Sequence, residues 1–522
     1  MANNSRTKNA LLNFISSIGG QLLVILMQFV VRTVFIQTLG KSYLGINGLF
    51  TNILSMLSLA EMGVGSAIIF KLYDPIAHSD QQRISMLMRF YKTVYRYIGV
   101  AVAVIGVCLI PFLPIFINDY EKLAELNISA VFIFLIYLFD SISSYLFFAY
   151  KSAMIKADQK EYFINLISYF FTIGSSVLQI ISLFLFKSFE IYVIIIVIKT
   201  IGQNLAVAVF ADKHYPFLKD KNADRISLEE AKGVFKDCAA LFVYKMNGVV
   251  LKSTDNIVLS AFLGLDSVAL YSNYAVFYIT IRTLFIKIFN SVGHSIGNLH
   301  TTHDIKQEYK VFETTMFVSA ILGGTAFVGI FVVADEFIRG WIGQDWILAQ
   351  PFSFLLGLEI YTHCNNQVLE RYRTSYGLFR QGWARPLAGM ILNLVVSIAL
   401  VRPLGISGVL IGTIAADWLT FVWYDPLILH RIGFEKAYPV SRYYLKFAKY
   451  TLTTFAVGLL DYLICAHLFV GYGWLSVIIH VAICGITTPV ALILASLKTQ
   501  EADYVLNFGL NQIKAFTKKL KQ

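Results

Sequence analysis

Long runs of apolar residues alternate with short polar segments along the whole chain. A helix that crosses the hydrocarbon core of a bilayer needs about 20 predominantly apolar residues. Fourteen windows of the 522-residue sequence satisfy this length. They are 11–38, 43–70, 97–117, 126–150, 162–186, 191–210, 238–263, 268–299, 311–334, 351–369, 383–401, 405–429, 444–469 and 474–497. The pattern therefore predicts an all-α polytopic membrane protein with about fourteen transmembrane helices.

The composition agrees with this class and excludes several others. Hydrophobic residues make up 57% of the chain and charged residues 14%, whereas soluble proteins have about 25% charged residues. The five cysteines include no CxxC pair, so they predict no metal site. The sequence contains no Walker A loop, no HExxH and no GxSxG motif. We therefore expect neither an enzyme nor a bound cofactor.

Basic residues are concentrated on one side of the predicted spans. With the N-terminus placed in the cytoplasm, 32 of the 43 Lys and Arg residues fall in cytoplasmic segments and five in the opposite loops. This bias predicts that both termini are cytoplasmic. The net charge of +11 is thus explained by membrane orientation and contact with membrane lipids, and no nucleic-acid partner is predicted. Ser79 and Ser227 each begin a capping-box pattern in the cytoplasmic segments.

Ionisable residues are concentrated in the predicted spans of the stretch 238–299. A charge at the centre of a spanning helix costs about 2.5–3.5 kcal/mol on insertion scales, so such residues normally face a partner or a wet cavity. The cations expected to line this cavity, two of them from earlier spans, are Arg32, Lys199, Lys245, Lys252, Arg282 and Lys287. Their sign favours an anionic cargo. The alternative for Lys252 is a self-neutralising pair with Asp255, three residues further along the helix.

A second group of spanning residues could hold counter-ions or couple transport to H⁺ or Na⁺. Glu359 and His363 are four residues apart on the tenth span, a spacing that places them on one helical face. They predict either a coupling site or a hydrogen-bonded lining of the same cavity. The full set of candidates is Asp140, Asp255, His294, Glu359 and His363. His467 and His480, on the last two spans, are interpreted as incidental.

A short repeat suggests two lobes. Leu39-Gly40 ends the first span and Leu263-Gly264 ends the seventh, 224 residues later. Inverted or parallel repeats of this kind place the substrate site at their interface. The predicted domains are an N-lobe of spans one to six with its linker (1–236), a C-lobe of spans seven to twelve (237–430), and spans thirteen and fourteen with a basic amphipathic tail (431–522).

Several segments resemble bacterial Wzx-type polysaccharide flippases of the multidrug/oligosaccharidyl-lipid/polysaccharide exporter superfamily. They are SRTKNA at 5–10, LAEMGVGSAI at 59–68, LYDPI at 72–76 and FAYKS at 148–152, together with Arg32 and the Lys252–Asp255 charges. The resemblance implies a V-shaped pair of six-helix bundles with two peripheral C-terminal helices. It also implies a location in the bacterial cytoplasmic (inner) membrane.

The same resemblance implies a function. The chain would move an undecaprenyl-pyrophosphate-linked oligosaccharide repeat unit from the cytoplasmic to the outer leaflet by alternating access. The product would serve capsule, exopolysaccharide or O-antigen-type synthesis, with polysaccharide polymerase machinery as a further partner. The alternatives are a lipid II flippase, which the charge pattern fits equally well, and a drug/cation antiporter of the same superfamily, which would need an acidic cavity. A membrane polymerase or glycosyltransferase is disfavoured by the short outer loops.

Overall fold

The structure is a computed structural model that describes most of the chain. The described residues are 2–58, 64–118, 120–125, 128–219, 226–227, 229–234, 253–300, 304–348, 350–378, 381, 384–468, 471 and 473–507. In these residues all regular structure is helical. The chain divides into two compact units, Met1–Ala269 and Leu270–Gln522. The predicted lobe boundary at 236/237 lies outside the described residues and stays a prediction.

The first unit is built mainly from α1 to α10. Its long helices are α1 (Ala2–Leu39), α2 (Lys41–Leu57), α3 (Val64–Ala77), α4 (Gln81–Leu109), α7 (Ala130–Leu146), α9 (Glu161–Phe186) and α10 (Phe189–His214). Short helices between and after them are η2 (Ile110–Phe112), α5 (Leu113–Phe116), α6 (Tyr120–Glu125), η3 (Ala149–Lys151), α8 (Ser152–Ala157) and η4 (Pro216–Lys219). Residues 229–234 and 253–263 are also helical. Helix α1 packs on α9, and α7 packs on both α4 and α10.

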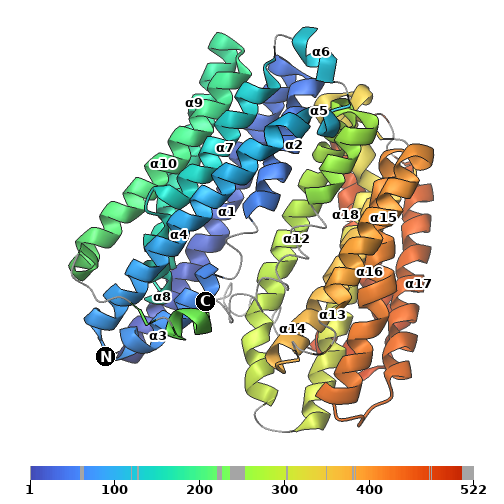
Figure 1. Cartoon of the computed structure of the whole chain (residues 1–522). Coiled ribbons are helices and arrows are strands. Elements are labelled where there is room, and N and C mark those ends of the chain that lie inside the picture. Colours follow the sequence, from blue (N-terminus) through green and yellow to red (C-terminus); the bar gives the residue numbers. More distant parts are fainter. Residues whose placement is uncertain are drawn as a thin grey trace, which may run out of the picture. The chain divides into compact units, whose positions relative to one another are not determined.

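The second unit holds the remaining helices, and α13 is its centre. They are α12 (Leu265–His300), which begins in the first unit, α13 (Ile305–Ile342), η5 (Gln344–Trp346), α14 (Phe352–Ser375), α15 (Ala384–Leu404), α16 (Ile406–Ile428), η6 (Leu429–Gly433), α17 (Val440–Cys465) and α18 (Trp474–Ala495). Helix α13 contacts α14, α17 and α18 (Figure 1). A Cβ on Gly357 would stand 2.8 Å from the Phe327 carbonyl oxygen. Glycine therefore permits the close approach of α13 and α14.

The predicted spans agree with the observed helices. A helix lies at each of the fourteen windows, although the seventh is described only from residue 253. Within the described residues, seven helices are long and apolar enough to cross a membrane, or eight if the bent pair Ala130–Leu146 and Ala149–Ala157 forms one span. The all-α polytopic membrane fold is confirmed.

Side chains at the helix starts explain where several helices begin. Asp80 caps α4 by accepting a hydrogen bond from the Arg83 amide at 2.9 Å, so the prediction of a cap at Ser79 is wrong by one residue. Ser79 instead has a positive φ of 56°, which takes it out of the capping position. The predicted cap at Ser227 is confirmed, because its hydroxyl accepts from the Glu230 amide at 3.2 Å.

Candidate functional site

Arg32 lies on α1 among aromatic side chains of the first unit. Its guanidinium interacts electrostatically with the Tyr192 phenol of α10. The Tyr192 ring lies 4.9 Å from the Phe35 ring, and Phe35 lies 5.8 Å from Phe189, both measured between centroids. Tyr43 packs edge-on against Phe189 at 5.5 Å. Arg32 thus interacts with a phenol that belongs to an aromatic cluster.

Asp140 and Lys199, which come from different predicted spans, are brought close together in this unit. Asp140 on α7 accepts a hydrogen bond from Thr200 and attracts Lys199, both on α10. One turn before Asp140, the Tyr137 hydroxyl donates to the Asn47 side chain of α2. Lys199 therefore has a carboxylate counter-ion. The packing of α7 on α10 creates this pair, which helical spacing within one span could not predict.

A polar network in the second unit joins three of the predicted site residues. Arg282 on α12 donates from Nη1 to the Tyr278 hydroxyl at 2.9 Å. Tyr278 in turn donates to the Glu359 carboxylate of α14, and its ring lies 6.4 Å from that of His363. Asp417 on α16 interacts electrostatically with Arg282. Tyr278 is thus the bridge between Arg282 and Glu359, and it was not among the predicted residues.

The network continues through α14, α15 and α16 as a row of alternating charges. Asp417 also interacts with Arg385, and Arg385 forms an ion pair with Asp425. The same Asp425 oxygen accepts from Arg373 Nη1 at 2.6 Å. Both residues were included in the count of 32 cytoplasmic Lys and Arg residues, yet the side chains of Arg373 and Arg385 are only 7% and 8% exposed. In this network the cations Arg282, Arg373 and Arg385 therefore each lie beside an acid.

The remaining predicted residues are only partly described. Asp255 is buried in the helical segment 253–263, and Lys287 is half-buried on α12. His294 is in α12, but its side chain lies outside the described part of the structure. Lys245 and Lys252 both lie outside the described residues. The two interpretations of Lys252 and Asp255, as a cargo site or as a self-neutralising pair, therefore both stay open.

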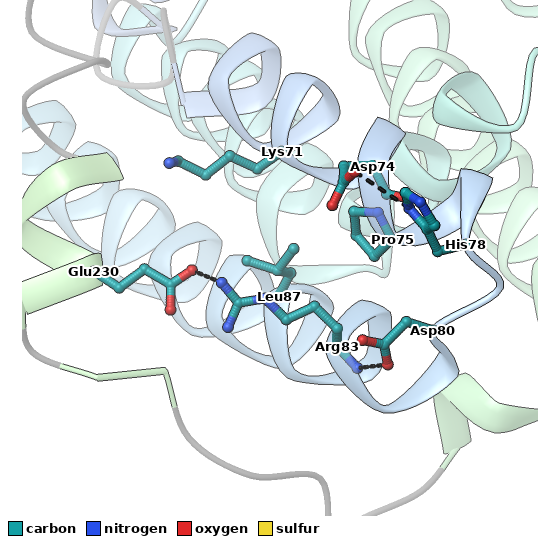
Figure 2. A pocket seen from close by; sticks show the side chains of 8 residues that line it. All are labelled: Lys71, Asp74, Pro75, His78, Asp80, Arg83, Leu87 and Glu230. Carbon is teal, nitrogen blue, oxygen red and sulfur yellow. Dashed lines mark hydrogen bonds and ion pairs between the residues drawn. The ribbon is translucent and has the colours of Figure 1, made fainter.

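A pocket of about 350 Å³ lies in the first unit between α3, α4 and the linker helix at 229–234. Figure 2 shows Arg83 and Glu230 pointing toward each other across it, and they form an ion pair. At the other end, His78 lies 3.3 Å from the Asp74 carboxylate. Besides this, the Ser85 hydroxyl of α4 donates to the Phe217 carbonyl oxygen of η4 at 3.2 Å. The pocket mixes both charges, and its contacts attach the linker to α4.

In the described residues, no group of three or more His, Cys, Asp or Glu side chains could hold a metal ion. Lone carboxylates such as Asp140, Glu359 and Asp417 are instead placed beside cations or hydroxyl groups. These described side chains can therefore bind charged groups and protons.

Comparisons with known proteins identify the fold. No family model matches the sequence, and no curated protein matches it. Among solved structures, the lipid II flippase MurJ in an inward closed conformation is similar with a TM-score of 0.66 at 14% identity, covering 93% of this chain and 99% of MurJ. An inward-facing multidrug resistance MATE family transporter of the MOP superfamily gives 0.57 at 13% identity, covering 80% and 96%.

A third solved structure, a mutant of the Vibrio cholerae MATE transporter VcmN, gives a TM-score of 0.52 at 14% identity, covering 83% of this chain and 99% of VcmN. At such identities the likeness establishes the fold and no more. The chain is a multi-pass membrane protein with the fold of the lipid II flippase MurJ and of MATE transporters.

Proposed function

We propose that the chain is a flippase for an undecaprenyl-pyrophosphate-linked oligosaccharide. The observation that carries the proposal is the likeness to MurJ over 93% of this chain and 99% of that one, because MurJ is itself a flippase of lipid II. The sequence segments at 59–68 and 72–76 support a polysaccharide repeat unit as the particular cargo. The proposed site of action is the bacterial cytoplasmic membrane, with both termini cytoplasmic and the polysaccharide polymerase machinery as a downstream partner.

The surroundings of Arg32 support an anionic, sugar-bearing head group. A guanidinium group can bind two phosphate oxygens at once, which makes Arg well suited to a pyrophosphate. The rings of Phe35, Tyr43 and Tyr192 lie within the same cluster, and aromatic faces offer apolar surface with a polar edge. In this proposal Arg32 binds the pyrophosphate, while the polyprenyl tail stays in the lipid.

The network of the second unit supports a role in alternating access. Arg282 donates to Tyr278 at 2.9 Å, Asp417 attracts Arg282, and Glu359 accepts from Tyr278. Binding of H⁺ or Na⁺ to Asp417 would weaken its attraction for Arg282, and binding to Glu359 would disturb its hydrogen bond with Tyr278. Glu359 and His363 are the proposed coupling residues in this unit, and Asp140 is the proposed one in the first.

Two alternatives belong to the same fold. A lipid II flippase would carry a related pyrophosphate, and lipid II is the cargo of MurJ. A drug/cation antiporter is the activity suggested by the multidrug resistance MATE structure. In the first unit the Asp140 carboxylate attracts the cation Lys199, and Arg32 on α1 is a further cation, next to the Tyr192 phenol. These cations favour an anionic cargo and therefore a flippase.

Complementation separates the three activities. The chain is expressed in a host lacking its oligosaccharide flippase, in a host depleted of its lipid II flippase, and in a host lacking its main drug exporters. We expect surface polysaccharide to return in the first host alone. Survival of the second host would instead identify a lipid II flippase, and drug resistance in the third an antiporter.

Variants test the proposed role of Arg32 in the first host. Arg32→Ala should reduce surface polysaccharide by about tenfold or more, as expected for loss of a charge-assisted contact worth about 1.5–3 kcal/mol. Arg32→Lys should retain part of the activity. The matched control is Arg339→Ala, because Arg339 is an exposed cation near the end of α13. Full activity of Arg32→Ala, at a protein level equal to that of the control, would contradict the mechanism.

A further inference from the structure

His480 of α18 lies between two hydrogen-bond acceptors. Its Nδ1 atom is 2.7 Å from Oε2 of Glu336 on α13. Its Nε2 atom is 2.8 Å from the carbonyl oxygen of Leu468, which follows α17. The His480 side chain is 4% exposed and that of Glu336 is 25% exposed. The imidazole thus joins three segments of the second unit.

The two acceptors fix the number of protons in this contact. A carbonyl oxygen can only accept, so the ring nitrogen facing Leu468 must carry a proton. A second proton must then lie between the other ring nitrogen and Glu336, because a nitrogen lone pair facing a carboxylate at 2.7 Å would be repelled. Exchanging the two ring nitrogens by a ring flip leaves this requirement unchanged. The contact therefore holds one proton more than a neutral His beside an ionised Glu.

From this geometry we propose that His480 and Glu336 form a proton-binding site that fastens the α17–α18 hairpin to α13. When the proton is bound, His480 donates to both Glu336 and Leu468. When it leaves, a lone pair faces the carboxylate and the contact opens. The ligand is H⁺ alone, and the site is separate from the network around Arg282.

Other titratable and charged groups lie on the helices packed around the site. Helices α13 and α17 pack against α18. From α17, Asp461 accepts a hydrogen bond from Thr487 at 2.5 Å, and the Cys465 thiol interacts electrostatically with Asp461 and Glu336. On α18 itself, Cys484 lies one helical turn beyond His480. On α13 the cation Arg339 follows Glu336 by three residues and is exposed. The electrostatic interaction of an exposed charge with other groups is weakened by screening.

The same end of α18 offers a natural reporter. The Trp474 ring lies 5.2 Å from the Phe337 ring of α13, and Phe337 is the residue after Glu336. Opening of the His480 contact would change the surroundings of Trp474. Trp346, which is buried on η5, serves as an internal reference within the same unit.

The test uses the full-length protein labelled with 5-fluorotryptophan, whose resonances are assigned by Trp474→Phe and Trp346→Phe. In the unsubstituted protein we expect the Trp474 signal to move when the pH is raised from about 5 to about 9, because the contact opens when its proton leaves. The contact is present at the acid end and lost at the basic end. The Trp346 signal should stay in place.

Two near-isosteric variants make the expectation specific. In Glu336→Gln, the Gln amide can donate to the neutral imidazole, so the Trp474 signal should keep its acid position at every pH. In His480→Gln, the imidazole is absent, so the Trp474 signal should not depend on pH. A Trp474 signal that is independent of pH in the unsubstituted protein, or that moves equally in Glu336→Gln, would overturn the proposal.

Discussion

At Asp425 a single buried carboxylate binds two guanidinium groups. Arg373 Nη1 lies 2.6 Å from it, and Arg385 forms the second ion pair. Arg373 also donates to the carbonyl oxygens of Leu378 at 3.1 Å and Gln381 at 2.7 Å. Arg373 therefore anchors the segment that connects α14 to α15. A buried ion pair is expensive to break because the remaining charge stays desolvated.

The first prediction concerns this anchor. Asp425→Asn should lower the free energy of unfolding by about 3–5 kcal/mol, the range for removing one partner of a buried pair, because the buried guanidinium of Arg373 then loses its acid. The control is Arg442→Ala, because the Arg442 side chain is 47% exposed and Glu313 keeps Lys446 at 2.8 Å. That change should cost less than about 1 kcal/mol. Denaturant unfolding in detergent measures both, and equal losses in the two variants would contradict the assigned role.

The second prediction concerns Glu501, which follows α18 and is 3% exposed. Burial opposes its ionisation, but hydrogen bonds from Lys446 at 2.6 Å and from Tyr450 at 3.1 Å outweigh this and hold the Glu501 pKa below its ordinary value of 4.5. A lowered pKa stabilises the fold above the ordinary value, and this stabilisation is lost as the pH falls through the folded-state pKa.

Glu501→Gln should therefore lower the unfolding temperature near neutral pH. The difference from the unsubstituted protein should shrink as the pH falls from about 7 to about 3. Asp503→Asn is the control, because Asp503 is exposed in the same helical segment. The prediction fails if the Glu501→Gln difference is the same at all pH values.

Among the helices, close packing depends on particular glycines. Gly45 of α2 is buried, and a Cβ added there would overlap the backbone carbonyl oxygen of Leu265 at the start of α12. Backbone atoms cannot move aside as a flexible side chain can. Gly45 therefore lets α2 approach residue 265 within the first unit.

The third prediction follows from this contact. Gly45→Ala should destabilise the protein by about 1–3 kcal/mol, as overpacking does. Gly174→Ala on α9 is the control, because a Cβ there meets nothing within 4 Å. That variant should be as stable as the unsubstituted chain or up to about 1 kcal/mol more stable, since Ala favours helix over Gly. A stable Gly45→Ala would show that α2 can separate from Leu265 at little cost.

For the whole molecule, the orientation in the membrane is the fourth prediction. Alkaline phosphatase fused after Lys232 should be inactive, because the basic linker is expected in the cytoplasm. The same enzyme fused after Gln344 should be active, because that segment is expected outside. Fusion-protein levels, measured by immunoblotting, control for expression. Activity at Lys232 together with inactivity at Gln344 would reverse the orientation.

The candidate site was only partly predictable from the sequence. Arg282, Glu359 and His363 were identified, because placing an ionisable group in an apolar span costs free energy and therefore indicates a functional role. Tyr278 and Arg385 were missed, since a tyrosine is common in membrane helices and Arg385 stands close enough to the start of an apolar window to resemble a loop residue. His480 was interpreted as incidental, because neither Glu336 nor Leu468 is near it in the sequence, at separations of 144 and 12 residues.

The sequence by itself determined the class of the protein and the place of its helices. Apolar length decides membrane insertion locally, so each span could be located without knowing its neighbours. Only the tertiary structure decided which charges meet. Helical spacing places a side chain on a face of its own helix, but the partner of that face depends on how the helices pack. The pairs Asp140 with Lys199, Asp425 with Arg373, and His480 with Glu336 all join different helices for this reason.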